Sequence, residues 1–221
     1  MGRLQGWLIA FVCMVAVVAG SYTFVDRPVA FYAHAHLTQY GVFDALTRIS
    51  EYLFVAAAIV FVLAGLRSLV SVQWARWQSA LLLCGVSLTA AEAVKDELKF
   101  VFGRTWPETW VNNNPSLIGN GVFGFNFFHG GAGYASFPSG HTTAVCAVAA
   151  VLWFAYPKLR PLWVIAVLAV VVGLIGADYH FVSDIVAGGF LGASAGWMTV
   201  LVADGGALPR LRAQASPPPP N

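Results

Sequence analysis

Three short polar groups interrupt an otherwise apolar chain, and their residue types would suit the handling of a phosphate. The first contains Lys99 and Arg104, at the end of an apolar segment. The second is the Pro-Ser-Gly-His run at 138–141. In the third, His180 lies four residues before Asp184, so on a helix the two side chains share a face and can hydrogen-bond.

The Pro-Ser-Gly-His run has the composition of a turn that opens a helix. Pro138 and Gly140 favour a turn, and Ser139 is a good N-cap for the apolar segment that follows. Such a helix start directs free N–H groups and a positive dipole end at the turn, which predicts an anion site with His141 beside it. Taken alone, the run is equally well explained as an ordinary capped helix with an incidental histidine.

Together the three groups could carry out phosphoryl transfer. A histidine oriented by a carboxylate can attack phosphorus, and a second histidine can protonate the departing oxygen. Cations and N–H dipoles would stabilise the charge. No dense set of His, Cys and carboxylate ligands is evident, so we predict chemistry without metal or cofactor.

Each group also has a plainer explanation. Lys99 and Arg104 could be cations that snorkel from a helix end. His180 and Asp184 could be a satisfied polar pair at a helix junction. These explanations weaken in a bilayer, where ionisable groups are costly and usually functional.

The composition is that of a membrane protein. The chain has 221 residues, of which 58% are hydrophobic and 10% charged, and its mean hydropathy is +0.71. A soluble domain could not bury this much apolar surface. The formal charge of +2 gives no indication of a nucleic-acid partner. The 3 cysteines lie in apolar runs and are best explained as small buried side chains.

Six apolar segments predict the architecture. They cover residues 6–25, 52–66, 78–91, 142–156, 162–177 and 185–203. We expect an all-α fold, an integral membrane bundle of six transmembrane helices with a long extracytoplasmic loop between helices 3 and 4. Residues 1–204 would form the one domain, with an uncleaved first span, and the Pro-rich residues 205–221 a disordered cytoplasmic tail.

The distribution of Lys and Arg predicts the orientation. One side would carry Arg3, Arg67, Arg76, Lys158, Arg160, Arg210 and Arg212. The other would carry Arg27, Arg48, Lys95, Lys99 and Arg104, two of which are assigned to chemistry. Both termini should therefore be cytoplasmic, and all three polar groups should face outward.

The polar groups resemble the three motifs of the type 2 phosphatidic acid phosphatase (PAP2) superfamily of integral membrane phosphatases. These are Lys-x6-Arg-Pro, Pro-Ser-Gly-His and Ser-Arg-x5-His-x3-Asp, and the order and spacing match over about residues 95–190. The resemblance implies that His180 is the nucleophile, that Asp184 orients it, and that His141 protonates the leaving group. It implies phosphate binding by Lys99, Ser139 and Gly140.

The first and third motifs depart from the family pattern. Trp106 occupies the Arg position of the first, and Gly173 and Leu174 occupy the Ser-Arg pair of the third. We hypothesise that Arg104 replaces the missing guanidinium as a phosphate ligand. Asp178, an unexpected negative charge near His180, has no assigned role.

The predicted function is a lipid phosphatase at the outer face of a bacterial-type inner membrane. It would hydrolyse a phosphomonoester or diphosphate of a lipid through a phosphohistidine. A lipid phosphotransferase of the same fold remains an alternative, as does a non-catalytic lipid-binding or transport protein with a degenerate site. The sequence indicates neither the lipid nor the oligomeric state. The aromatic loop 105–137 could contact the headgroup or merely pack. Residues 26–50 could form an interfacial helix, in which an interfacial position is favoured over metal binding for His34 and His36.

Overall fold

The computed structural model describes residues 2–68, 75–110 and 113–205, and its regular elements are helices. The α-helices are α1 (Arg3–Phe24), α2 (Asp26–His36), α3 (Val42–Ser68), α4 (Arg76–Phe102), α5 (Leu117–Asn120), α6 (Gly140–Ala155), α7 (Arg160–Gly176) and α8 (Val182–Asp204). Short 3-10 helices cover Ala132–Tyr134 and Pro157–Leu159. The described residues contain isolated β-bridges but no strand.

The all-helical membrane architecture predicted from the sequence is confirmed. Each of the six apolar segments coincides with a helix to within one residue at its end. Five helices (α1, α3, α4, α8, and α7 with the short helix before it) are long and apolar enough to cross a membrane. α6 has 16 residues, fewer than a spanning helix usually needs, so the count of six spans stays a prediction. The tail predicted to be disordered lies outside the described residues from position 206 onward.

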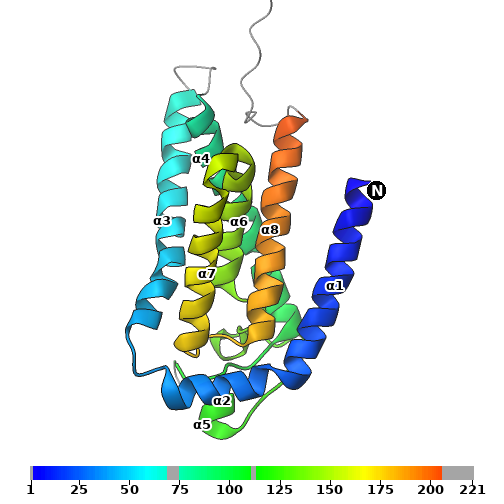
Figure 1. The fold of residues 1–221 in the computed structure, drawn as a ribbon, viewed down its shortest axis with the longest axis vertical. Coiled ribbons are helices and arrows are strands. Elements are labelled where there is room, and N and C mark those ends of the chain that lie inside the picture. Colours follow the sequence, from blue (N-terminus) through cyan, green and yellow to red (C-terminus); the bar gives the residue numbers. More distant parts are fainter. Residues whose placement is uncertain (1, 69–74, 111–112, 206–221) are drawn as a thin grey trace, which may run out of the picture.

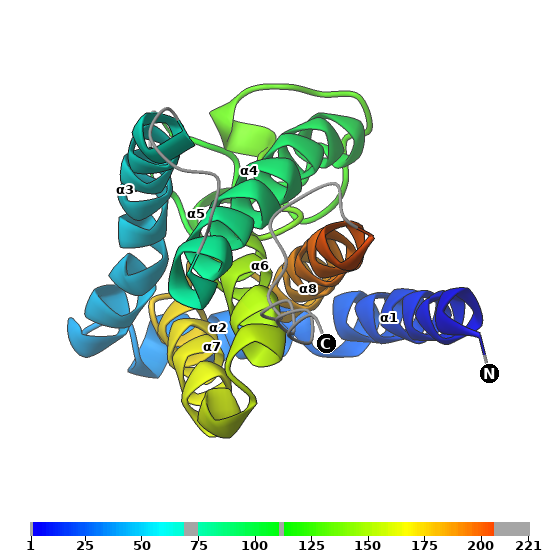
Figure 2. The ribbon, with the colours of Figure 1, turned by 90° about the horizontal axis from the view of Figure 1, so that it is seen from above.

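Helix α6 forms the centre of the bundle. It packs against α8, α4, α7 and α3, and its contact with α8 is the most extensive (Figure 1). Helix α1 contacts α8 through side chains, with Trp7 Nε1 donating to Ser194 Oγ at 3.0 Å, while its axis diverges from α8 (Figures 1 and 2). The other long helices run roughly parallel.

Helix α2 lies across one end of the bundle, beside the connection between α4 and α6 (Figure 1). The interfacial helix expected over 26–50 is shorter than predicted. α2 ends at His36, a turn follows, and α3 begins at Val42, so the second half of that segment belongs to a long apolar helix.

A row of glycines lets α8 approach α6 closely. Gly188, Gly192 and Gly196 recur every four residues and therefore lie on one face of α8. A Cβ on Gly192 would stand 2.2 Å from the Thr143 carbonyl oxygen, and one on Gly188 would stand 2.4 Å from that of Ser139. Small residues at this spacing allow two membrane helices to pack backbone to backbone. The contact holds the 138–141 turn against the start of α8.

We predict that Gly192→Ala destabilises the fold by about 1–3 kcal/mol, because the added methyl group overpacks the α6–α8 contact. The matched control is Gly189→Ala, where the nearest atom to a new Cβ, Cys146 Sγ, is 3.7 Å away. Thermal unfolding of the detergent-solubilised protein compares the two variants. Equal stability of the two would contradict the close approach described here.

Candidate active site

The three polar groups meet at one end of the bundle. α4 ends there, α6 begins there, and α7 turns into α8 there (Figure 1). The imidazole ring centroids of His141 and His180 are 5.8 Å apart. The Ser139 N–H donates to the Asp184 carbonyl oxygen at 3.0 Å, which joins the second group to the third.

Asp184 is held from several directions and faces one nitrogen of His180. Its Oδ2 accepts hydrogen bonds from the Ser136 hydroxyl at 2.6 Å and from the Phe181 N–H at 3.1 Å. His180 Nδ1 lies 3.5 Å from the same oxygen and 3.5 Å from Ser136 Oγ. Since Nδ1 is directed at the carboxylate, Nε2 on the opposite side of the ring is the nitrogen available to a substrate.

His180 is almost fully buried, and burial controls its charge. Loss of water lowers the pKa of the imidazole below its usual range, while the hydrogen bond and the charge of Asp184 oppose that effect. A lowered pKa favours the neutral ring at neutral pH. The neutral ring has the lone pair that a nucleophile needs.

Arg104 is fully buried, with a relative exposure of 0%, and its guanidinium joins two carboxylates. One terminal nitrogen donates to Asp184 Oδ1 and to the Ser183 hydroxyl, both at 2.5 Å. The other donates to Asp26 Oδ2 at 2.7 Å. Four aromatic rings surround the cation with centroids 4.3–5.4 Å from Cζ: Phe181, Phe125, Tyr22 and Phe123.

This geometry does not support the expectation that Arg104 binds the phosphate. Both terminal nitrogens are engaged by Asp26 and Asp184, and no part of the side chain reaches the surface. Asp26, which closes the arrangement from α2, was not identified from the sequence. The backbone N–H of Ser183 donates to Asp26, but the two residues are 157 positions apart in the sequence, and no local pattern connects them.

Lys99 lies next to the histidines. Its ammonium nitrogen is 5.8 Å from the centroid of the Trp106 ring, and that ring is 5.1 Å from the ring of His180. Trp106, at the position of the first motif's arginine, therefore packs against the His180 ring as an apolar neighbour. Its indole N–H donates to the Ala132 carbonyl oxygen at 2.7 Å.

A second lysine, which was not assigned to the site from the sequence, lies close to the 138–141 turn. Lys95 Nζ is 3.6 Å from the point where a Cβ on Gly140 would stand. The ammonium group is paired with Glu92 and, at 2.9 Å, with Asp96. Lys95 precedes Lys99 by four residues, and that spacing on one helical face was the signal that could have revealed it.

The start of α6 presents unused donors. Ser139 is its N-cap residue but makes no side-chain capping bond, and Ser139 Oγ is buried without a hydrogen-bond partner among the described residues. The first N–H groups of a helix have no intrahelical acceptor, and those of Gly140 and His141 belong to this set. A buried hydroxyl and free N–H groups at a helix start form an anion site.

The departures in the third motif have a packing explanation. A Cβ on Gly173 would stand 2.8 Å from the Phe43 carbonyl oxygen, so α7 contacts α3 too closely there for a serine. Leu174 is fully buried and packs in a cluster with Val145, Val170 and Ile185. These two positions hold α7 in the bundle and do not reach the histidines.

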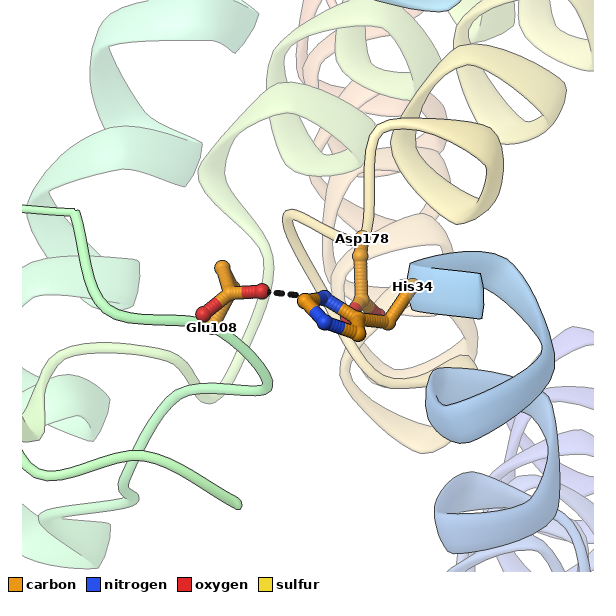
Figure 3. A group of neighbouring side chains, drawn as sticks. All are labelled: His34, Glu108 and Asp178. Carbon is orange, nitrogen blue, oxygen red and sulfur yellow. Dashed lines mark ion pairs between the residues drawn. The ribbon is translucent and has the colours of Figure 1, made fainter. Parts of the chain in front are cut away.

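Asp178, which had no assigned role, belongs to a further cluster with His34 and Glu108 (Figure 3). His34 Nδ1 is 2.6 Å from Glu108 Oε2. Burial, with a smaller effect of the nearby Glu108 charge, raises the pKa of Asp178 to about 7. The three residues come from separate parts of the chain, so sequence spacing did not predict their meeting.

We predict that Arg104→Ala costs about 3–5 kcal/mol of unfolding free energy, because it leaves Asp26 and Asp184 buried without their cation. The control is Arg48→Ala, since the Arg48 side chain is 60% exposed in its pair with Asp44. That exposed pair is screened by water, so its loss should change stability far less than the loss of Arg104. Denaturant unfolding measures both values, and a small cost at Arg104 would contradict a structural role for its ion pairs.

Two known proteins are similar in sequence to about half of this chain. A lipid A 1-phosphatase of Rhizobium etli is 31% identical over 106 residues, which cover 48% of this chain and 41% of that protein. A lipid A 1-phosphatase of Rhizobium johnstonii is 30% identical over 106 residues, covering 48% and 39%. The match thus spans less than half of either relative. No solved structure matches the chain.

The family comparison covers the helices that carry the site. The model of the PAP2 superfamily matches residues 80–205, which is more than half of the chain and runs from α4 to the end of α8. All the residues singled out above from α4 onward lie within the match. The chain therefore belongs to the PAP2 superfamily.

Proposed function

We propose that this protein is a lipid phosphatase that works through a phosphohistidine at His180. The observation that carries the proposal is the pairing of His180 Nδ1 with Asp184 at 3.5 Å, with the ring of His141 5.8 Å from that of His180. One imidazole is oriented as a nucleophile, and the second is close enough to exchange a proton with an oxygen on the same phosphorus.

In the first step, Nε2 of His180 attacks phosphorus, and the bond from phosphorus to the lipid oxygen breaks. His141 donates its proton to that oxygen, so the lipid leaves as an alcohol. Asp184 stabilises the positive charge that develops on the His180 ring. Arg104 holds Asp184 in place and takes no direct part.

In the second step, water attacks the phosphorus of phosphohistidine. His141, now neutral, accepts a proton from the water, and the bond between phosphorus and Nε2 breaks. The products are inorganic phosphate and free His180. His141 gives up a proton in the first step and accepts one in the second. In this proposal neither displacement needs a metal ion.

The phosphate oxygens would be held by Lys99, the Ser139 hydroxyl and the Gly140 N–H. The unpartnered, buried Ser139 Oγ supports this role. Lys95 lies close to Gly140, and its ammonium group, which is paired with Glu92 and Asp96, would add positive charge near the phosphate without being a direct ligand. Preorganised cations and N–H dipoles are the main source of rate enhancement in phosphoryl transfer.

An apolar cavity supports a lipid as the substrate. It has a volume of about 890 Å³ and lies between α1, α4 and α8. Its lining is almost wholly apolar and includes Trp7, Phe11, Val94, Phe137, Pro138 and Leu191. Pro138 directly precedes Ser139, so acyl chains in this cavity would end at the proposed phosphate site.

The relatives' names point to one substrate to be tested first. Both are lipid A 1-phosphatases, so a glycolipid carrying a phosphate on its sugar is the leading candidate for this chain. Phosphatidic acid, phosphatidylglycerol phosphate and polyprenyl diphosphate are the other candidates. The charge pattern of the loops places the site on the extracytoplasmic face in this proposal, with both termini in the cytoplasm.

We predict that His141→Ala lowers steady-state phosphate release from the preferred lipid by about 100-fold or more, because the alkoxide leaves without a proton. With p-nitrophenyl phosphate, whose leaving group needs no proton, the variant should show one rapid burst of nitrophenolate per chain. Slow turnover should follow, because water attack on the phosphohistidine has lost its base.

The measurements are phosphate release from the lipid panel and stopped-flow absorbance with the soluble ester. His180→Ala should abolish both activities, and His129→Ala, an exposed ring stacked on Tyr134, should retain them. Excess chelator should leave turnover measurable, because neither displacement uses a metal ion. Phosphate release only in the presence of an acceptor lipid would overturn hydrolysis in favour of phosphotransfer.

A further inference from the structure

A second group of polar residues lies beside the active site and takes no part in the proposed reaction. It consists of His34 from α2, Glu108 from the connection between α4 and α6, and Asp178 from the turn between α7 and α8 (Figure 3). One donor atom from each residue lies within 4.8 Å of the other two. Figure 3 shows the three side chains converging from separate elements.

Asp178 is the unsatisfied member of this group. The residue is 2% exposed, and its Oδ2 has no hydrogen-bond partner among the described residues. No ion pair of Asp178 is found in the described part of the chain, whereas Glu108 is paired with His34 at 2.6 Å. A buried carboxylate without hydrogen bonds or a cation is costly. The group therefore lacks a positive charge next to Asp178.

We propose that His34, Glu108 and Asp178 bind a divalent transition-metal ion of the zinc class. Imidazole nitrogen and carboxylate oxygen are both ligand types that zinc accepts, and water would take the fourth position beside these three residues. The nitrogen ligand disfavours Mg²⁺ and Ca²⁺, which prefer oxygen. The ion would replace the direct contact between His34 and Glu108 and would balance the charge of Asp178.

The dimensions suit such an ion after small side-chain rotations. Ligands about 2.0–2.2 Å from zinc in a tetrahedron are about 3.3–3.6 Å from one another. The present separations are 2.6 Å for the His34–Glu108 pair and no more than 4.8 Å within the group. The His34 and Glu108 side chains are 47% and 19% exposed, so an ion can reach Asp178 from solvent.

The position of the site indicates a structural role next to the chemistry. Asp178 lies two residues before His180, and α2 also carries Asp26, which pairs with Arg104. A bound ion would fix the turn that carries His180 to α2 and to the long connection. It would act by positioning this turn, since none of the three ligands is among the residues proposed to contact phosphate.

The test uses the full-length protein in detergent, stripped of metal with a chelator and then titrated with Zn²⁺. We expect one Zn²⁺ per chain by calorimetry, a rise in the thermal unfolding temperature, and a Co²⁺ absorbance spectrum typical of tetrahedral coordination. His34→Ala, Glu108→Gln and Asp178→Asn should each weaken Zn²⁺ binding by at least about 10-fold. Asn is chosen because Asp178 has a φ of 55°, which asparagine tolerates.

The matched control is His36→Ala, which removes an exposed ring that lies against Tyr32 of the same helix. It should bind Zn²⁺ as the wild type does. Absence of stoichiometric binding by the wild type, or unchanged affinity in all three ligand variants, would overturn the proposal. If one variant fails to fold without metal, the remaining two provide the same comparison. Binding is measured without substrate, so a failure of the proposed phosphatase activity would not be confused with a failure of this site.

Discussion

The buried pairing of Arg104 with Asp26 and Asp184 is the interaction on which the active-site end of this protein depends. A guanidinium with no exposed surface must be matched by anions, because an unpaired charge in an apolar interior costs several kcal/mol. Its partners come from α2 and α8, while Arg104 itself follows α4. One side chain therefore fixes three elements relative to one another.

The same pairing determines how Asp184 meets His180. Arg104 takes one carboxylate oxygen, which leaves the other for Ser136, the Phe181 N–H and the imidazole. The aromatic rings around Arg104 exclude water and strengthen these contacts. The positive charge of Arg104 thus orients the proposed nucleophile through Asp184, and in the proposed mechanism Lys99 is the cation that contacts the phosphate.

Patterns of local origin were predictable from the sequence. The apolar segments became helices because their composition requires burial in protein or lipid, and the spacing of His180 and Asp184 brought them together as expected. The 138–141 turn opens α6 as predicted. These features follow from residues within a few positions of one another, which is the range over which propensity and helical periodicity act.

Features that depend on distant residues were not predictable. The sequence suggested Arg104 as the replacement for a missing phosphate ligand. Nothing near Arg104 in the chain indicates its partner Asp26, which is 78 residues away. The meeting of His34, Glu108 and Asp178 depends on how α2 crosses the end of the bundle. Leu174 is a related case. It occupies the arginine position of the third motif, and only the packing of α7 shows that it is a core residue.

The most direct test of the account is to identify the phosphorylated residue during turnover. The wild-type protein would be mixed with its preferred lipid phosphate, quenched in base to preserve phosphohistidine, and mapped by mass spectrometry. We predict phosphate on His180 of the wild type and none in His180→Asn, and more of it in His141→Ala when p-nitrophenyl phosphate is the donor. Phosphate on another residue, or turnover by His180→Asn at the wild-type rate, would contradict the assignment of His180 as the nucleophile.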